Sequence, residues 1–107
     1  MREVKLSVHP FTMGTDKEAA LKPLEEAAEL YSEWQALDFC LAMTPHCRTC
    51  ETDEGIHGCA FKADLADEIA DTIQACVNLA ARYSLNLDAA LERVEKRNIA
   101  RGRYEDD

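Results

Sequence analysis

The sequence predicts an all-α fold, and two of its features lead to this expectation. Ala and Leu are frequent, whereas Gly, Pro, Val and Ile are few, a composition that favours helices over strands. Apolar residues also recur at helical spacing over long segments. A chain of 107 residues has the length of one domain with a modest core. We therefore expect residues 1–107 to form one helical bundle of about three main helices.

The first long helix is expected to begin at Thr15 and to end at about Leu41 or Met43. Thr15 and Glu18 have the spacing of a capping box, in which each residue bonds the backbone N–H of the other. Pro23 lies too deep for a first-turn proline, so it should kink this helix or separate a short lead-in from the main segment. Residues 1–14 are ambiguous between a short strand and an ordered arm.

Two further helices are expected after an irregular stretch at about 44–60, which reads as a loop or a small inserted feature. That stretch has no helical period and holds two of the four glycines and three of the five cysteines. The second helix is expected at about 61–83. Asn86 is a plausible N-cap for the third helix, at about 87–100.

The irregular stretch is also a candidate zinc site, because it offers four soft ligands: Cys47, Cys50, His57 and Cys59. The first two have the spacing of a zinc knuckle, and such ligands suit tetrahedral Zn²⁺. Reduced loop thiols and a redox role remain open as alternatives. Cys40 and Cys76 fall near apolar helix faces and are expected to be small core residues.

Charge and composition exclude several classes of function. The formal net charge of −9 argues against general nucleic-acid binding, which needs a basic surface. No apolar run reaches the roughly 18 residues that span a bilayer, so no membrane partner is expected. The N-terminus lacks the apolar stretch of a signal peptide, and five cysteines without an export signal argue against a disulfide framework. We expect a cytoplasmic protein.

On both long helices, acidic side chains border the apolar stripe. The stripe of the first helix is Leu30, Trp34, Leu37 and Leu41, and the neighbouring acids are Glu25, Glu26, Glu29 and Glu33. The stripe of the second helix is Leu65, Ile69, Ile73, Cys76 and Leu79, and its neighbours are Asp64, Glu68, Asp71 and Asn78. These polar faces are solvated surfaces or, if the stripes pack together, two halves of one site.

Packing of the two stripes would bring Glu26 and Glu29 opposite Glu68 and Asp71. Four carboxylates at a partly dry seam repel one another unless a cation compensates them. Mg²⁺ prefers all-oxygen coordination that includes carboxylates, waters and substrate phosphates. The sequence therefore predicts a magnesium site at the seam, with Lys22 and Asn78 as candidate substrate-binding residues.

The ordered pair of motifs, Glu25-Glu26-x-x-Glu29 followed by Glu68-x-x-Asp71, resembles the signature of the MazG-like all-α nucleoside triphosphate pyrophosphohydrolases. The likeness extends to the flanking segments "LKPLEEAAEL" and "ADEIADTIQACVNLAARYSLNLDAALERVEKRNIARGRY", which together cover about two thirds of the chain. The third helix ends in Asn98-x-x-Arg101, which is similar to the polar pair found there in that family.

The resemblance implies a helical bundle completed by oligomerisation, as a homodimer or homotetramer. It implies hydrolysis of a nucleoside triphosphate between the α- and β-phosphates, with Mg²⁺ as the cofactor and Mn²⁺ as a substitute. By the same resemblance, Glu26, Glu29, Glu68 and Asp71 are the metal ligands. Glu25 would be an outer-sphere ligand or a base that orients water, and Asn98 and Arg101 would lie near the phosphates.

Two alternatives remain open from the sequence. A dUTPase-type or phosphoribosyl-ATP-type hydrolase would share the acids and differ in its base pocket. A non-catalytic helical oligomerisation module with a zinc-binding loop would share the fold without the chemistry.

Overall fold

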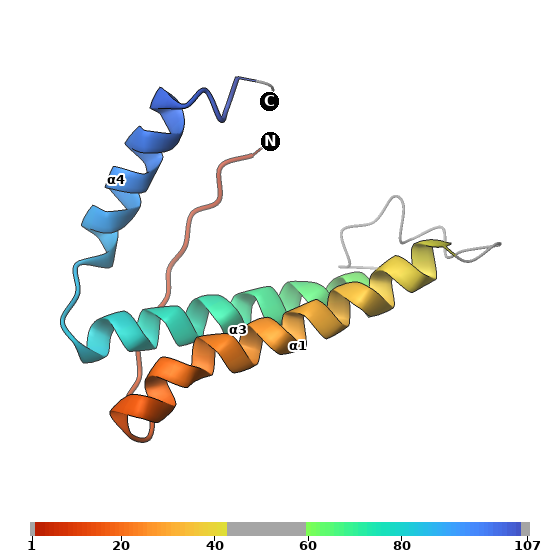
Figure 1. Ribbon diagram of the computed structural model, residues 1–107, viewed down its shortest axis with the longest axis horizontal. Helices are drawn as coiled ribbons and strands as arrows, with labels where there is room; N and C mark the ends of the chain where they lie inside the picture. Colours follow the sequence, from red (N-terminus) through yellow and green to blue (C-terminus); the bar gives the residue numbers. More distant parts are fainter. Residues whose placement is uncertain (1, 43–59, 106–107) are drawn as a thin grey trace.

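The computed structural model describes residues 2–42 and 60–105. They form three helices, α1 (Asp16–Ala42), α3 (Ala60–Arg82) and α4 (Leu87–Ala100), shown in Figure 1. The all-α prediction is confirmed, since these residues contain no strand. Residues 2–14 form an extended arm, which resolves the ambiguity at the N-terminus. The candidate zinc ligands Cys47, Cys50, His57 and Cys59 lie outside the described residues.

The helix starts follow the capping signals of the sequence. The N–H of Glu18 donates to Thr15 Oγ1 at 3.2 Å, and the N–H of Thr15 donates to Glu18 Oε1 at 3.1 Å, so the capping box is confirmed. These bonds to Thr15 lower the pKa of the Glu18 carboxyl. Asn86 caps α4 by accepting from the N–H of Ala89 at 3.0 Å. Pro23 lies inside α1, which is a single helix, so it separates no lead-in segment.

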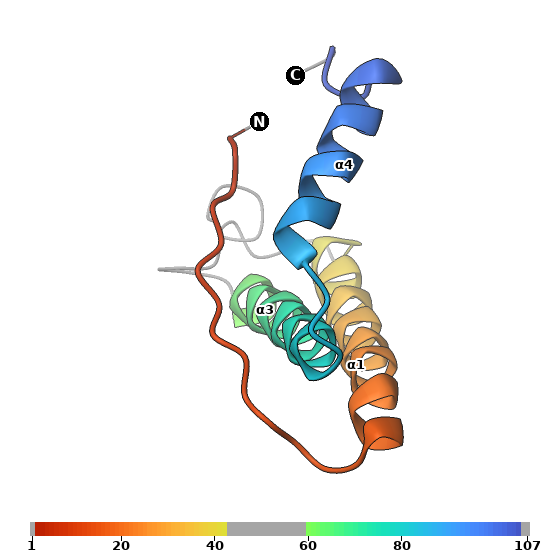
Figure 2. The ribbon, with the colours of Figure 1, turned by 90° about the vertical axis from the view of Figure 1, so that its left-hand side faces the viewer.

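Helices α1 and α3 form an antiparallel hairpin and lie side by side along their length (Figures 1 and 2). The buried apolar residues at this contact and along α3 are small: Ala19, Ala75 and Ala80. Alanines let two helix backbones approach closely, which leaves a narrow apolar seam. Glu26 and Asn78 are also buried, so polar groups share the interior with the alanines.

This narrow seam corrects part of the predicted apolar stripes. Trp34 is 44% exposed and stacks on the Tyr31 ring, with 5.7 Å between ring centroids, instead of entering the core. Cys76 is exposed, so its prediction as a core residue is wrong. Leu30 and Leu37 are half-buried. The buried apolar residues among the described ones are alanines, whereas these larger side chains are half-buried or exposed.

The arm is fixed to α3 by three polar side chains one helical turn apart. Gln74 Nε2 donates to the carbonyl of His9, and Asn78 Oδ1 accepts from the N–H of Phe11, both at 2.9 Å. Arg82 donates to the carbonyls of Met13 and Gly14, also at 2.9 Å, and pairs with Asp16. We refer to Gln74, Asn78 and Arg82 as the clasp. The clasp orders a segment that has no secondary structure of its own.

Helix α4 leaves the end of α3 and extends away from the hairpin in both views (Figures 1 and 2). It makes few contacts with α1 and α3. An open groove of about 1250 Å³ lies between the arm, α3 and α4. Its apolar lining includes Val4, Leu6, Ile73, Leu87, Leu91 and Val94. None of the described helices combines the length and apolarity needed to cross a membrane.

Candidate metal centre

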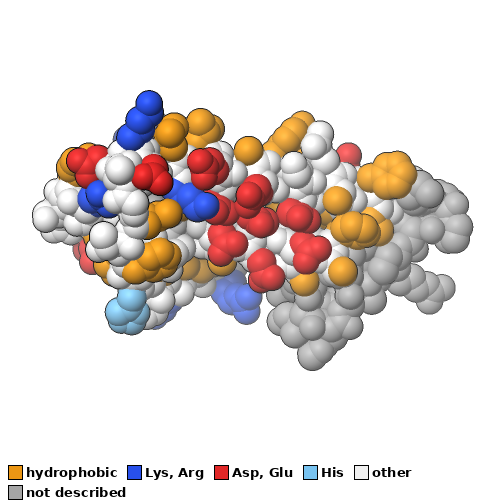
Figure 3. Space-filling view, turned by 90° about the horizontal axis from the view of Figure 1, so that it is seen from below, with side chains coloured by type: hydrophobic (Ala, Val, Ile, Leu, Met, Phe, Trp, Pro, Cys, Tyr) orange, Lys and Arg blue, Asp and Glu red, His pale blue; other side chains and the backbone are white. Residues whose placement is uncertain are grey.

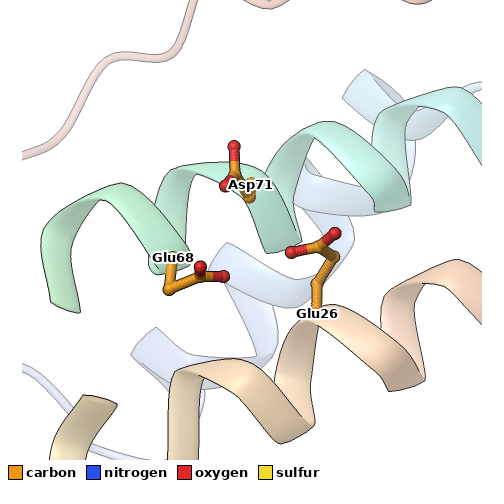
Figure 4. Close-up of side chains that lie close together, drawn as sticks. All are labelled: Glu26, Glu68 and Asp71. Carbon is orange, nitrogen blue, oxygen red and sulfur yellow. The ribbon is translucent and has the colours of Figure 1, made fainter. Parts of the chain in front are cut away.

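Three carboxylates from two helices converge at the seam between α1 and α3. Glu26 comes from α1, and Glu68 and Asp71 come from α3 (Figure 4). One oxygen of each lies within 4.8 Å of the others. Two ligands of one Mg²⁺ ion, with bonds of about 2.1 Å, lie at most about 4.2 Å apart. Small side-chain rotations therefore bring this triad, which we call the acidic triad, into coordination geometry.

Helical spacing explains why these acids meet. Glu68 and Asp71 are three residues apart, so they share one side of α3. Glu26 is seven residues after the buried Ala19, which places both on the side of α1 that faces α3. The acidic triad thus follows from helix geometry once the two helices pack as an antiparallel pair.

Two oxygens of the triad are buried without a hydrogen-bond partner among the described residues. They are Oε2 of Glu26 and Oε2 of Glu68, and the Glu26 residue is only 8% exposed. Buried polar atoms without partners are rare and unfavourable in folded proteins. A cation between the carboxylates would satisfy both oxygens, so the donor set fits a hard divalent ion.

The electrostatics of Glu68 agree with this geometry. Its pKa is raised to about 7, first by desolvation and then by the negative charges of Glu29, Glu26 and Asp71 and a hydrogen bond to Glu26. Figure 3 shows Asp and Glu side chains gathered on this face of the molecule, bordered by hydrophobic side chains. Negative charge is therefore concentrated at this site.

The other predicted acids lie around the triad. Glu29 is exposed and outside the triad, but its charge acts on Glu68. Glu25 is exposed, with Oε2 at 3.6 Å from Lys22 Nζ. Lys22 Nζ also lies 3.2 Å from Glu26 Oε1, and these interactions, that with Glu26 first, raise the pKa of Lys22. Lys22 thus compensates one oxygen of Glu26 and leaves the other without a partner.

The remaining candidate residues lie away from the triad. Asn78 is 4% exposed and belongs to the clasp. Asn98 donates to the Tyr104 hydroxyl at 3.3 Å, and Arg101 is the exposed C-cap of α4. Both belong to α4 and its C-cap, and α4 extends away from the hairpin that carries the acidic triad (Figure 1).

Sequence reasoning did not identify Gln74 and Arg82, which hold the arm beside the seam. Their signal was the spacing of Gln74, Asn78 and Arg82 at four-residue intervals, which puts three hydrogen-bonding side chains along one side of α3. Comparison with models of known families, with curated proteins and with solved structures finds no match.

Proposed function

We propose that this chain is a Mg²⁺-dependent nucleoside triphosphate pyrophosphohydrolase. The observation that carries the proposal is the acidic triad, in which the buried Glu26 carboxylate has an oxygen with no partner among the described residues. Acidic side chains alone are common on protein surfaces. A buried carboxylate with one oxygen left without a partner and with two more carboxylates facing it from another helix is typical of a cation site.

Glu26, Glu68 and Asp71 would hold the metal, with Glu29 beside them as the fourth acid of the motif. When bound, Mg²⁺ supplies positive charge that draws the triphosphate to an acidic surface and offsets charge developing on phosphorus. The raised pKa of Glu68 is consistent with this role, since the negative neighbours that raise it are the ones a cation would bridge.

In the proposed reaction, a water oxygen forms a bond to the α-phosphorus while the bond from that phosphorus to the oxygen bridging it to the β-phosphorus breaks. Pyrophosphate leaves with the electron pair, and a carboxylate accepts the proton of the water. Glu25 and Glu29 are exposed carboxylates beside the triad and suit this role. The Lys22 ammonium, already next to Glu26, would bind phosphate oxygens.

The test is pyrophosphate release by purified protein from a panel of NTPs and dNTPs with Mg²⁺. Glu68→Gln and Asp71→Asn should reduce kcat/KM by at least 100-fold and weaken Mg²⁺ binding while circular dichroism shows an unchanged helical content. Asp67→Asn, an exposed acid of the same helix, is the matched control and should retain activity. If the wild type releases no pyrophosphate from any substrate, the proposed function is wrong.

The same variants separate an enzyme from a non-catalytic oligomerisation module. In such a module, removal of one of several like charges should leave the fold unaffected or stabilise it, and no Mg²⁺ affinity would be lost.

A homodimer is part of this proposal. Seventeen large hydrophobic side chains of the described residues are exposed, and the buried apolar residues are three alanines. A second copy would cover part of that surface and would allow Asn98 and Arg101 to approach the triad of its partner.

A further inference from the structure

We infer that the pocket between the arm and the clasp receives the base of the nucleotide, with Phe11 stacking on it and Asn78 donating a hydrogen bond to it. This inference rests on the proposed function and extends it from the phosphates to the nucleoside. It assigns the base-binding role to the arm, a segment that carries none of the acids of the triad.

The pocket has a volume of about 510 Å³ and is lined by residues of the arm, α1 and α3. Its lining is Pro10, Phe11, Thr12, Met13, Asp16, Ala19, Asn78, Ala81 and Arg82. Ala19 lies seven residues before Glu26 on α1, and Asn78 lies seven residues after Asp71 on α3.

Seven residues are two helical turns, about 10 Å along each axis. Since α1 and α3 are antiparallel, both shifts lead toward the same end of the seam (Figure 1). The pocket and the triad are therefore separated by a distance comparable to the length of a nucleoside monophosphate. A nucleotide with its base in the pocket would place its α-phosphate at the triad.

Asn78 provides an oriented donor in this pocket. Its Oδ1 accepts from the N–H of Phe11 and from Gln74 Nε2, both at 2.9 Å, so the orientation of the amide is fixed. Its Nδ2 contacts the Met13 sulfur at 4.0 Å, and a thioether is a weak acceptor. The residue is 4% exposed. A buried N–H group with so weak an acceptor would bond a stronger one, such as a base carbonyl.

Phe11 contributes an aromatic side chain to the lining of the pocket. The residue is 58% exposed although its backbone N–H is fixed by Asn78. The clasp thus holds the arm in place while the ring remains available, so stacking would cost little additional ordering. Arg82 also lines the pocket but is bonded to Asp16 and to two arm carbonyls. We therefore assign Arg82 only to the lining of the pocket, and we assign the contacts that select the base to Phe11 and Asn78.

The chemical class of the ligand follows from the donor. Uracil, cytosine and guanine can accept from Asn78 Nδ2 at a carbonyl oxygen, and adenine can accept at a ring nitrogen. We therefore expect all four NTPs to bind and inorganic triphosphate, which has no base, to bind about tenfold more weakly, the ratio that corresponds to one hydrogen bond of typical strength.

The first experiment compares Phe11→Ala with Phe39→Ala under Mg²⁺. Phe39 is 67% exposed and lies near the opposite end of α1, so it is a matched aromatic control. Loss of stacking in Phe11→Ala should raise KM for the preferred triphosphate about tenfold and leave kcat unchanged. Phe39→Ala should keep the wild-type KM. Equal KM values in the two variants would overturn the inference.

The second experiment needs no catalysis. In metal-free protein, titration with uridine monophosphate should shift the NMR signals of the Asn78 side-chain NH₂ group, and Phe11→Ala should weaken this binding about tenfold. If these shifts occur but the wild type hydrolyses no triphosphate, the pocket is upheld and the proposed function fails. If the wild type is active but neither the NMR signals nor KM respond, the inference fails and the proposed function stands.

Discussion

Glu68 is a carboxyl group whose ionised form is disfavoured both by burial and by the negative charges around it. Its Oε2 has no hydrogen-bond partner among the described residues, and its pKa is raised to about 7 by desolvation and by Glu29, Glu26 and Asp71. In the unfolded chain the same carboxyl titrates near its ordinary value of 4.5. The folded state therefore binds the proton of Glu68 more tightly than the unfolded state does.

This difference predicts how the stability of the metal-free protein depends on pH. Because the folded pKa is the higher one, the contribution of Glu68 to stability is complete below about pH 4.5 and is lost as the pH rises through about 7. In a chelating buffer, the melting temperature of the wild type should fall between pH 5 and pH 8. Glu68→Gln, which cannot ionise, should show a smaller fall in circular-dichroism melts and should be more stable than the wild type at pH 8.

Addition of Mg²⁺ should reverse the order of the two proteins. At pH 8 the ion should stabilise the wild type more than Glu68→Gln, because it binds the ionised carboxylates of the folded state. Parallel pH curves for the two metal-free proteins would contradict the assignment of the raised pKa to Glu68.

At the scale of the elements, the sequence predicted the bounds of the helices well. It predicted poorly which of their side chains are buried and which of them hold the arm. Helix ends depend on local signals such as the Thr15 capping box and the Asn86 N-cap, and these could be read directly. The side of each helix that carries Glu26, Glu68 and Asp71 followed from periodicity. These features need no knowledge of distant residues.

The misplaced residues depend on distant partners. Trp34 was assigned to the core because it lies in an apolar stripe, but it is 44% exposed, and the buried apolar residues of the two helices are alanines. The clasp joins residues 65 to 69 positions apart in the chain, and no local pattern in the arm indicates its partners. Pro23 was expected to kink α1 or to separate a short lead-in from it, and α1 continues through Pro23 without a separate lead-in.

From the contacts of the clasp we predict that one substitution can weaken the attachment of the arm to the hairpin. Arg82 makes two hydrogen bonds to arm carbonyls and pairs with Asp16, so Arg82→Ala should weaken attachment of the arm by about 2 kcal/mol. Hydrogen exchange at the Phe11 amide should become about thirtyfold faster, whereas amides in the middle of α3 should keep their rates. Arg93→Ala, an exposed residue of α4, is the control. Unchanged exchange at Phe11 would show that Arg82 does not hold the arm.

At the scale of the whole molecule, α4 has a side that one copy of the chain leaves uncovered. Leu91 is 52% exposed and Val94 is 38% exposed, and both line the groove between the arm, α3 and α4. The charged residues of that groove are two basic and three acidic: Arg2, Arg103, Glu3, Asp88 and Glu95. A chain of net charge −9 would repel its copy at most surfaces, but much less at this nearly balanced one.

We therefore expect the groove to be the dimer interface, with α4 of each copy packed against the groove of the other. Light scattering coupled to gel filtration should give a mass of twice 12.0 kDa for the wild type. Leu91→Asp should shift the equilibrium to monomer. Leu24→Asp, at the 69% exposed position on the outer side of α1, should keep the dimer mass.

Two outcomes would contradict this interface: a monomeric wild type, or a dimer that Leu24→Asp disrupts and Leu91→Asp does not. Alkylation of Cys76, which lines the groove, gives a second measurement and should be faster in Leu91→Asp than in the wild type.

The attachment of an extended arm to a helical hairpin also bears on how such a protein can evolve. The acids that would hold the metal belong to two helices that pack against each other, whereas Phe11 and Met13 belong to a segment held mainly through its backbone. Side chains of the arm can therefore be exchanged without disturbing the acids. Natural variation at a few N-terminal positions would then change what the pocket beside the arm binds while the acidic triad stays the same.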